Sequence, residues 1–211
     1  FYGLWLDETM SYSAALFDDT DEPFVDAQLR KYDRILDRLG EKPDHVLEIG
    51  CGWGGFAERA IERGDHRVTG LTLSPAQAAY ARDRLAAQLA PSGRAVVQTI
   101  TVDNDYFDSY RKGGDAVRSY IFPGGMLPSE NRFAEEAGRA GLRLTDTHRF
   151  GQDYATTLDR WLAAFDARID DVRALGYDEK FIRLWRFYLA SCAGAFRCGR
   201  TDVMQVELQH A

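Results

Sequence analysis

Residues 46–55 read VLEIGCGWGG, a short apolar run that breaks into a glycine-rich turn. The amphipathic segment FAERAIERG follows at once. The pattern predicts a β-strand, a tight turn and the start of a helix. Glycine lets a backbone approach a ligand closely, and a helix N-terminus offers free N–H groups. The stretch therefore predicts a ligand-binding strand–turn–helix unit, with a plain loop as the alternative.

The flanking segments extend this unit into an alternating α/β pattern. An apolar helical period runs from Phe24 to Leu39 and ends at Gly40, and Ser74-Pro75 reads as the start of another helix. In order, we expect a helix over 24–39, a strand over 46–49, a helix over 56–63, a strand over 67–73 and a helix over 75–90. This order predicts the opening half of a doubly wound sheet.

The second half of the chain reads as mostly helical. A strand is predicted at VVQTITV (96–102), and YIFPGGMLPS reads as a turn element. Beyond it we expect helices over 129–140, 158–175 and 178–198, an extended return near 143–147 and a final strand near 201–208. Phe1 falls inside what reads as a helix, so further residues are expected upstream.

One interval is too short for a doubly wound sheet. Two more strand–helix units should lie between the helix over 75–90 and VVQTITV, because that strand would otherwise have no neighbour. We expect roughly fifty residues, the length of two such units, to be absent between about Ala86 and Leu89. A continuous helix that ends at Pro91, in a minimal fold, is the alternative.

Composition restricts the classes of protein. The chain has 211 residues and is 45% hydrophobic, which fits one α/β domain with elaborations or two small domains. Its net charge of −7 argues against nucleic acid as the main partner. No apolar run is long enough to span a membrane, and no signal sequence opens the chain. Neither the cysteines nor the four histidines have the spacing of metal ligands, so we expect reduced thiols, a cytoplasmic protein and no metal.

Six segments resemble, in order and spacing, the cyclopropane-fatty-acid synthase family, which includes the mycolic acid cyclopropane and methyl-modifying enzymes. They are YSAALF, VLEIGCGWGGFAERA, VTGLTLSPAQ, RSYIFPGGMLPS, FGQDYATTLDRW and FIRLWRFYLASCAGAFRCG. The resemblance implies a single S-adenosylmethionine (SAM) methyltransferase domain over 1–211 with a doubly wound Rossmann-like sheet. Its core would cover about 40–110 and the C-terminal strand, and a helical lipid-binding cover would span about 115–198.

The resemblance also implies the cofactor residues. Gly50, Gly52 and Gly54 match the turn that approaches SAM, and Tyr12 and Ser13 match a pair that closes over its carboxylate. The nucleoside would be held by Thr72, Leu73 and Gln77. Trp53 is expected either to line the cofactor edge or to pack in the core.

The family's active site holds a bicarbonate ion as the base, and this sequence keeps only part of its ligand set. Tyr154 and Ile100 match, whereas Ala14 stands at the cysteine position and Gln98 at the histidine position. The two changes should weaken anion binding by roughly 1–3 kcal/mol for each bond lost. Cys192 matches a family cysteine; a structural thiol is its alternative reading.

The resemblance implies methylation of the double bond in unsaturated phospholipid acyl chains, giving a cyclopropane or a methyl-branched product. Methylation of another hydrophobic small molecule and a catalytically degenerate SAM- or lipid-binding protein are the alternatives. Phe181, Trp185 and Tyr188 form a stripe that is either core or the wall of an acyl channel, with Arg183 and Arg186 beside it. We expect peripheral contact with the inner face of a membrane, and the sequence leaves a homodimer open.

Overall fold

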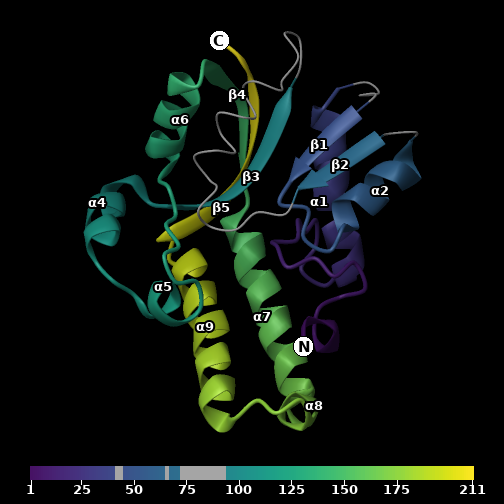
Figure 1. Cartoon of the computed structure of the whole chain (residues 1–211), viewed down its shortest axis with the longest axis vertical. Helices are drawn as coiled ribbons and strands as arrows, with labels where there is room; N and C mark the ends of the chain where they lie inside the picture. Colours follow the sequence, from purple (N-terminus) through teal and green to yellow (C-terminus); the bar gives the residue numbers. More distant parts are fainter. Residues whose placement is uncertain (41–44, 65–66, 72–93) are drawn as a thin grey trace.

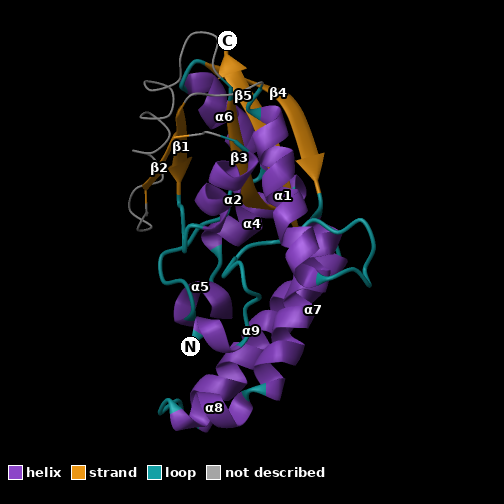
Figure 2. Cartoon of the chain, turned by 90° about the vertical axis from the view of Figure 1, so that its right-hand side faces the viewer, coloured by secondary structure: helices purple, strands orange, loops and turns teal. Residues whose placement is uncertain are grey.

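The computed structural model describes residues 1–40, 45–64, 67–71 and 94–211. Within this part of the chain, two sheets lie side by side and a long helical pair projects from them (Figure 1, Figure 2). The predicted α/β class is correct. Residues 86–89, where we expect an omission, lie outside the described residues.

The first sheet contains the strand that precedes the glycine-rich turn at 50–55. Strand β1 (His45–Ile49) pairs in parallel with β2 (Arg67–Leu71), and α2 (Gly55–Arg63) connects them. Helix α1 (Phe24–Arg38) packs against α2. The buried contacts between these elements are made by Tyr32, Leu36, Val46, Phe56 and Ala60. The predicted strand–turn–helix unit and its parallel partner are therefore confirmed.

The second sheet is antiparallel and has the strand order β3-β5-β4. Its strands are β3 (Ala95–Val102), β4 (Leu142–Arg149) and β5 (Thr201–His210). Helix α6 (Glu130–Arg139) covers it through Ala137, which joins Met204 and Val206 in a buried cluster. The predicted strand near the C-terminus and the extended return before it are both confirmed.

The two sheets share no ladder among the described residues, since β1 pairs only with β2 and β3 pairs only with β5. We expected the strand VVQTITV, which is β3, to have no neighbouring strand without the absent units. This is wrong for one of its two edges, where it pairs with β5. Val97 faces Val206 across the β3–β5 ladder, because the C-terminal strand returns to that edge. The other edge of β3 faces the β1 side of the molecule.

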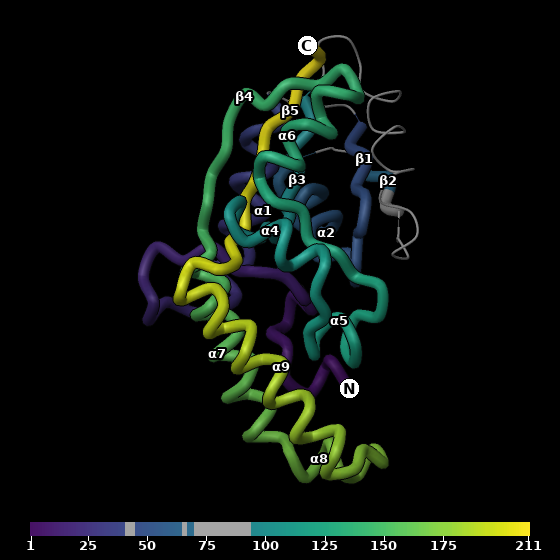
Figure 3. Tube along the Cα trace, turned by 90° about the vertical axis from the view of Figure 1, so that its left-hand side faces the viewer, coloured from purple at the N-terminus to yellow at the C-terminus, as the bar shows by residue number. Residues whose placement is uncertain are grey.

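The helical pair consists of α7 (Gly151–Ala167) and α9 (Glu179–Arg197), connected by α8 (Ile169–Ala174). Figure 3 shows that α7 and α9 run side by side to the end of the molecule farthest from the sheets. The helix expected over 158–175 was placed too late: α7 begins at Gly151, where the backbone N–H donates to Asp202 Oδ1 over 2.8 Å. It also breaks at Arg168, between α7 and α8.

The N-terminal segment is not the helix that we expected at Phe1. After a single 3-10 turn, η1 (Tyr2–Leu4), the chain is irregular as far as Pro23, and Asp7 Oδ2 accepts from the Thr9 N–H over 3.0 Å in a local turn. The polar stretch after β3 contains two helices that we did not predict, α4 (Asn104–Lys112) and α5 (Ala116–Tyr120). Neither has a buried residue, so no apolar period revealed them.

Candidate functional site

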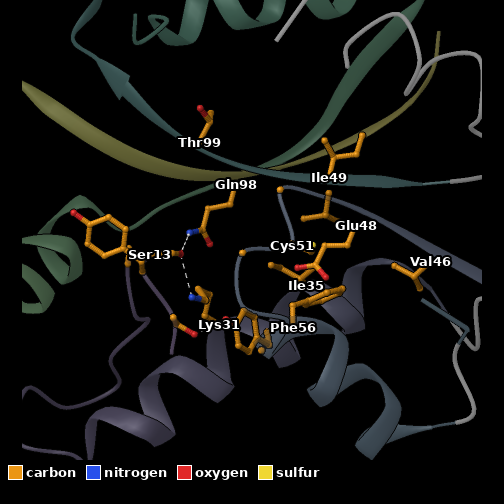
Figure 4. Close-up of a pocket in the computed structure, with 18 of the residues that line it drawn as sticks. Ser13, Lys31, Ile35, Val46, Glu48, Ile49, Cys51, Phe56, Gln98 and Thr99 are labelled. Carbon is orange, nitrogen blue, oxygen red and sulfur yellow. Dashed lines mark hydrogen bonds between the residues drawn. The ribbon is translucent and has the colours of Figure 1, made fainter. Parts of the chain in front are cut away.

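A cavity of about 1260 Å³ lies between the two sheets. One wall is β1 with the glycine turn, and the facing wall is the first part of β3. The segment Thr9–Ala14 and helix α1 close the cavity from the side, as Figure 4 shows for Ser13 and Lys31. Tyr154 of α7 also lines it. The cavity therefore brings the predicted cofactor turn and most of the predicted reactive residues together.

The glycine turn has the backbone that its sequence requires. Gly50, Gly52 and Gly54 have φ angles of 87°, 49° and 88°, in the left-handed region that favours glycine. The Gly54 N–H donates to the Cys51 carbonyl over 2.8 Å and closes the turn ahead of α2. All three predicted glycines therefore hold the backbone in one tight turn at the end of β1.

Gly55 is required by a close approach. A Cβ at this position would lie 2.9 Å from the Thr9 carbonyl oxygen and 3.1 Å from the Tyr32 hydroxyl. The Ser11 hydroxyl is also hydrogen-bonded to that of Tyr32. Because residue 55 has no side chain, the segment Thr9–Ala14 can pack against the start of α2.

Tyr12 and Ser13 both line the cavity, as predicted. The Tyr12 ring stacks on Trp161 with centroids 5.0 Å apart, and its hydroxyl lies 2.8 Å from that of Tyr188. Burial raises the pKa of Tyr12 well above its ordinary value. Tyr12 is therefore a neutral, fixed wall of the cavity.

A chain of polar side chains crosses the cavity wall at Ser13. Ser13 Oγ accepts from Gln98 Nε2 over 2.9 Å and lies 3.1 Å from Lys31 Nζ (Figure 4). Gln205 Nε2 donates to Gln98 Oε1 over 3.1 Å, so the Gln98 amide presents its NH₂ group to Ser13. Gln98 thus takes part in the site as a hydrogen-bond donor.

Lys31 is a cavity residue that the sequence analysis missed. Its side chain is 1% exposed, its Nζ lies 2.7 Å from Gln28 Oε1, and burial lowers its pKa to about 7. A signal was present, because Gln28 and Lys31 occupy positions of α1 that point to the same face as the buried Ala27. A polar pair on the apolar face of a helix indicates a functional or structural contact.

Glu48 is a second residue that we missed. It lies on β1 two positions before Gly50 and lines the cavity, and its Oε2 is buried without a hydrogen-bond partner among the described residues. Burial raises the pKa of its carboxyl group. An unsatisfied carboxylate oxygen beside a glycine turn can accept from the amino or hydroxyl groups of a ligand.

The residues assigned to the anion clamp lie around the same cavity. Ala14, Ile100 and Tyr154 all line it, although Ala14 is 1% exposed and offers no side-chain hydrogen bond. Burial raises the pKa of Tyr154 above its ordinary value, so this group is a phenol. Cys192 does not line the cavity, and burial raises its pKa to about 11. A protonated thiol in that position fits the structural reading.

The remaining predicted residues have mixed outcomes. Trp53 is 66% exposed at the rim of the cavity, so the core reading is wrong. Thr72, Leu73 and Gln77 lie outside the described residues. Trp185 and Tyr188 are buried in the aromatic cluster between α7, α9 and the N-terminal segment, with Phe181 packed against it, which supports the core reading of their stripe. In the described part of the chain, no group of three or more potential metal ligands gathers.

Helices long and apolar enough to cross a membrane are also absent from the described ranges.

Comparisons with known proteins agree with this arrangement. The family model of mycolic acid cyclopropane synthetase matches residues 1–92 and 83–206. The cyclopropane synthase MmaA2 from Mycobacterium tuberculosis superposes with a TM-score of 0.87 at 28% identity, covering 98% of this chain and 92% of that one. Mycolic acid cyclopropane synthase CmaA1, complexed with SAH and CTAB, superposes with a TM-score of 0.86 at 29% identity, covering 99% and 93%. The fold is therefore the doubly wound Rossmann-like fold of SAM-dependent methyltransferases.

Curated relatives include tuberculostearic acid methyltransferase UfaA1 of Mycobacterium tuberculosis, 34% identical over 97% of this chain. The chain spans only 61% of the length of that relative. Cyclopropane mycolic acid synthase 3 of the same organism is 30% identical, over 99% of this chain and 92% of its own length. The family match and these identities cover nearly the whole chain, and the chain belongs to the mycolic acid cyclopropane synthetase family.

Proposed function

We propose that this protein transfers the methyl group of SAM to the double bond of an unsaturated fatty-acyl chain. One observation carries the proposal. A single cavity joins the glycine turn at 50–55 to Ile100 and Tyr154, so a methyl donor on the turn would face the apolar and aromatic side of the same space. Family relatives are named as lipid methyltransferases and cyclopropane synthases.

The residues present fit SAM. The glycines of the turn at 50–55 let a ligand approach the protein backbone closely. The buried Glu48 Oε2, which has no hydrogen-bond partner among the described residues, can accept from an ammonium or hydroxyl group. Tyr12 and Ser13 would close the cavity over the amino-acid part. When bound, SAM supplies an electrophilic methyl group. The chain's own residues position the alkene, exclude water and bear the positive charge that appears on it.

Aromatic side chains suit that charge. Tyr2, Tyr12 and Tyr154 line the cavity, and their π-faces stabilise a cation without adding to it. Burial raises the pKa of Tyr12 and Tyr154, so neither is a phenolate that would trap the cation. These walls favour a carbon nucleophile over a polar one.

The carbocation on the acyl chain becomes neutral when its new methyl group loses a proton. Ring closure onto the neighbouring cationic carbon gives a cyclopropane, whereas a 1,2-hydride shift to that carbon before the proton is lost gives a methylene group. We favour a substantial methylene fraction, because Ala14 and Gln98 replace the cysteine and the histidine that the resemblance assigns to the anion clamp. A saturated methyl branch would need a hydride donor in addition.

The test is to incubate the natural full-length protein with SAM and vesicles of dioleoyl phosphatidylglycerol. S-adenosylhomocysteine and acyl chains lengthened by one carbon are the expected products. Methyl transfer to polar metabolites only would favour a methyltransferase of another small molecule. Tight SAM binding without turnover on any unsaturated lipid would favour a degenerate binding protein.

We also propose that the protein touches lipid surfaces. Three large apolar side chains lie exposed at the end of α5 and in the loop that follows it: Tyr120, Phe122 and Met126. Insertion of such side chains into the headgroup region would bring an acyl chain towards the cavity, with the protein on the inner face of the membrane. Flotation of the protein with vesicles, lost in the triple alanine variant, is the expected result.

An internal block of the family's chain is proposed to be absent from the sequence. Two observations support this. The family model matches in two stretches, 1–92 and 83–206, which overlap over residues 83–92. The alignment with UfaA1 runs over 260 positions, although 97% of this chain is only about 205 residues. Such a block would supply a strand between β1 and β3. The natural protein should then have an intact mass clearly above 23.8 kDa.

A further inference from the structure

The proposed reaction releases one proton whichever product forms, and this inference rests on that proposed function. Neither replaced clamp position supplies a base. Ala14 has no polar side-chain atom, and the Gln98 amide, which donates to Ser13, does not take up a proton at ordinary pH. The proton therefore needs an acceptor other than these two side chains.

Four of the titratable groups that line the cavity are Tyr12, Tyr154, Glu48 and Lys31. Tyr12 and Tyr154 are phenols whose buried hydroxyls resist ionisation. Glu48 lies on β1 beside the turn that we assign to the methyl donor. Lys31 lies instead in the polar chain with Ser13 and Gln98, next to Ala14. Of these groups, Lys31 is the one that shares a hydrogen-bond partner, Ser13, with the replaced position Gln98.

The partners of Lys31 suit a neutral amine. Its Nζ lies 2.7 Å from Gln28 Oε1 and 3.1 Å from Ser13 Oγ, and both groups are uncharged. A neutral amine has two N–H groups and one lone pair, so it can donate to Gln28 while accepting the Ser13 O–H. Gln98 Nε2 then donates to Ser13 Oγ and leaves that oxygen a second lone pair.

We propose that Lys31, acting through the Ser13 hydroxyl, is the proton acceptor of this site. A C–H bond of the new methyl group breaks, and its electron pair closes the ring onto the neighbouring cationic carbon. For the methylene product, a 1,2-hydride shift first moves the charge to the methylated carbon, and the same electron pair then forms the double bond. The proton passes to Ser13 Oγ as the Ser13 hydroxyl proton moves to Lys31 Nζ. The amine becomes an ammonium, the lipid becomes neutral, and no further reactant is consumed.

The surroundings of Lys31 favour the neutral amine more than water does, and they tolerate the ammonium after the reaction. Burial lowers its pKa, and the Asp7 carboxylate is the charged group that opposes this effect. The Tyr32 ring lies 4.4 Å from Nζ and can face the ammonium. From β5, Gln205 approaches only the Lys31 backbone carbonyl, over 3.4 Å.

The closing experiment compares two substitutions in the natural full-length protein. Lys31→Arg keeps a positive charge but cannot act as a base, and Lys31→Met keeps the length of the side chain without charge. With SAM and dioleoyl phosphatidylglycerol vesicles, both should reduce kcat for product formation by at least about 100-fold. Both should also abolish the rise of kcat with pH that the unaltered protein shows. Lys180→Met, on the exposed start of α9, is the matched control and should change neither.

A rescue experiment separates the proton acceptor from a structural role. Lys31→Ala should regain activity with added methylamine or ethylamine, in proportion to the concentration of the neutral amine. Ser13→Ala should lower kcat, and the further change Lys31→Met should add little to it. If Lys31→Arg keeps the product yield and the pH profile of the unaltered protein, or if amines do not rescue a folded Lys31→Ala, the inference is overturned. If the unaltered protein forms no S-adenosylhomocysteine, the proposed function fails first and takes the inference with it.

Discussion

Gln98 on β3 and Gln205 on β5 face each other in the ladder, and the side-chain Nε2 of Gln205 donates to the side-chain Oε1 of Gln98 over 3.1 Å. This contact orients Gln98 so that its NH₂ group reaches Ser13 in the cavity wall. An imidazole at position 98 would lose that arrangement but could carry a positive charge. The residue at position 98 therefore determines whether an amide or a group that can carry a positive charge faces Ser13.

Restoring the clamp should change the product. We expect the double variant Ala14→Cys, Gln98→His to raise the fraction of cyclopropane over methylene product severalfold, measured by mass spectrometry and NMR of released acyl chains with added bicarbonate. Ala15→Cys is the matched control, because Ala15 is equally buried but does not line the cavity. Efficient ring closure in the unaltered protein would contradict the weakened clamp.

Glu48 should hold SAM. Glu48→Gln removes the charge but keeps the shape, so SAM affinity should fall by about 1.5–3 kcal/mol, or roughly 10- to 100-fold. Isothermal titration calorimetry measures the change. Glu58→Gln on the exposed side of α2 is the control and should bind SAM normally. Equal affinities for the Glu48 variant and the unaltered protein would remove Glu48 from the site.

Gly55 should tolerate no side chain. In Gly55→Ala, the Cβ would meet the Thr9 carbonyl oxygen at 2.9 Å, so the segment Thr9–Ala14 must move and SAM binding should weaken. Gly194→Ala is the control, since Gly194 is a helical glycine with nothing within 4 Å of its added Cβ. That change should raise the free energy of unfolding by about 0.5–1 kcal/mol. A Gly55 variant that binds SAM normally would contradict the close approach.

Lys31 should make stability increase with pH. Its folded-state pKa of about 7 lies below the ordinary value of about 10.4, so the unfolded chain binds more protons between these limits. The free energy of unfolding should therefore rise by up to about 1.4 kcal/mol per pH unit more than in Lys31→Met. Urea unfolding between pH 7.5 and 8.5 measures this, because the raised pKa of Cys192 acts in the opposite direction above about pH 9. Parallel curves would show that Lys31 is charged in the folded protein.

Much of the fold could be predicted because its signals are local. The run VLEIGCGWGG predicted its strand, its tight turn and the start of α2, and the aromatic stripe of Phe181, Trp185 and Tyr188 marked α9. Helices α4 and α5 were missed because none of their residues is buried, and the start of α7 was missed because Gly151 is fixed by the distant Asp202. Tertiary contacts of this kind leave no local pattern.

The site could be predicted only in part, for the same reason. The resemblance indicated Tyr12, Ser13, Gly50 and Gly52, and these line the cavity, whereas Gly54 belongs to the same turn without lining it. The network around Lys31 joins α1 to the segment Thr9–Ala14 and, through Ser13, to β3, so its members are far apart in the sequence. Only the placement of Gln28 and Lys31 on the buried face of α1 could have indicated it.

The most direct test of the central claim uses SAM with a trideuterated methyl group and vesicles of dioleoyl phosphatidylglycerol. The proposed reaction should give acyl chains that gain one carbon carrying two of the three deuterium atoms, with S-adenosylhomocysteine formed in equal amount. S-adenosylhomocysteine formed without labelled acyl chains, or an added carbon that keeps all three deuterium atoms, would contradict it.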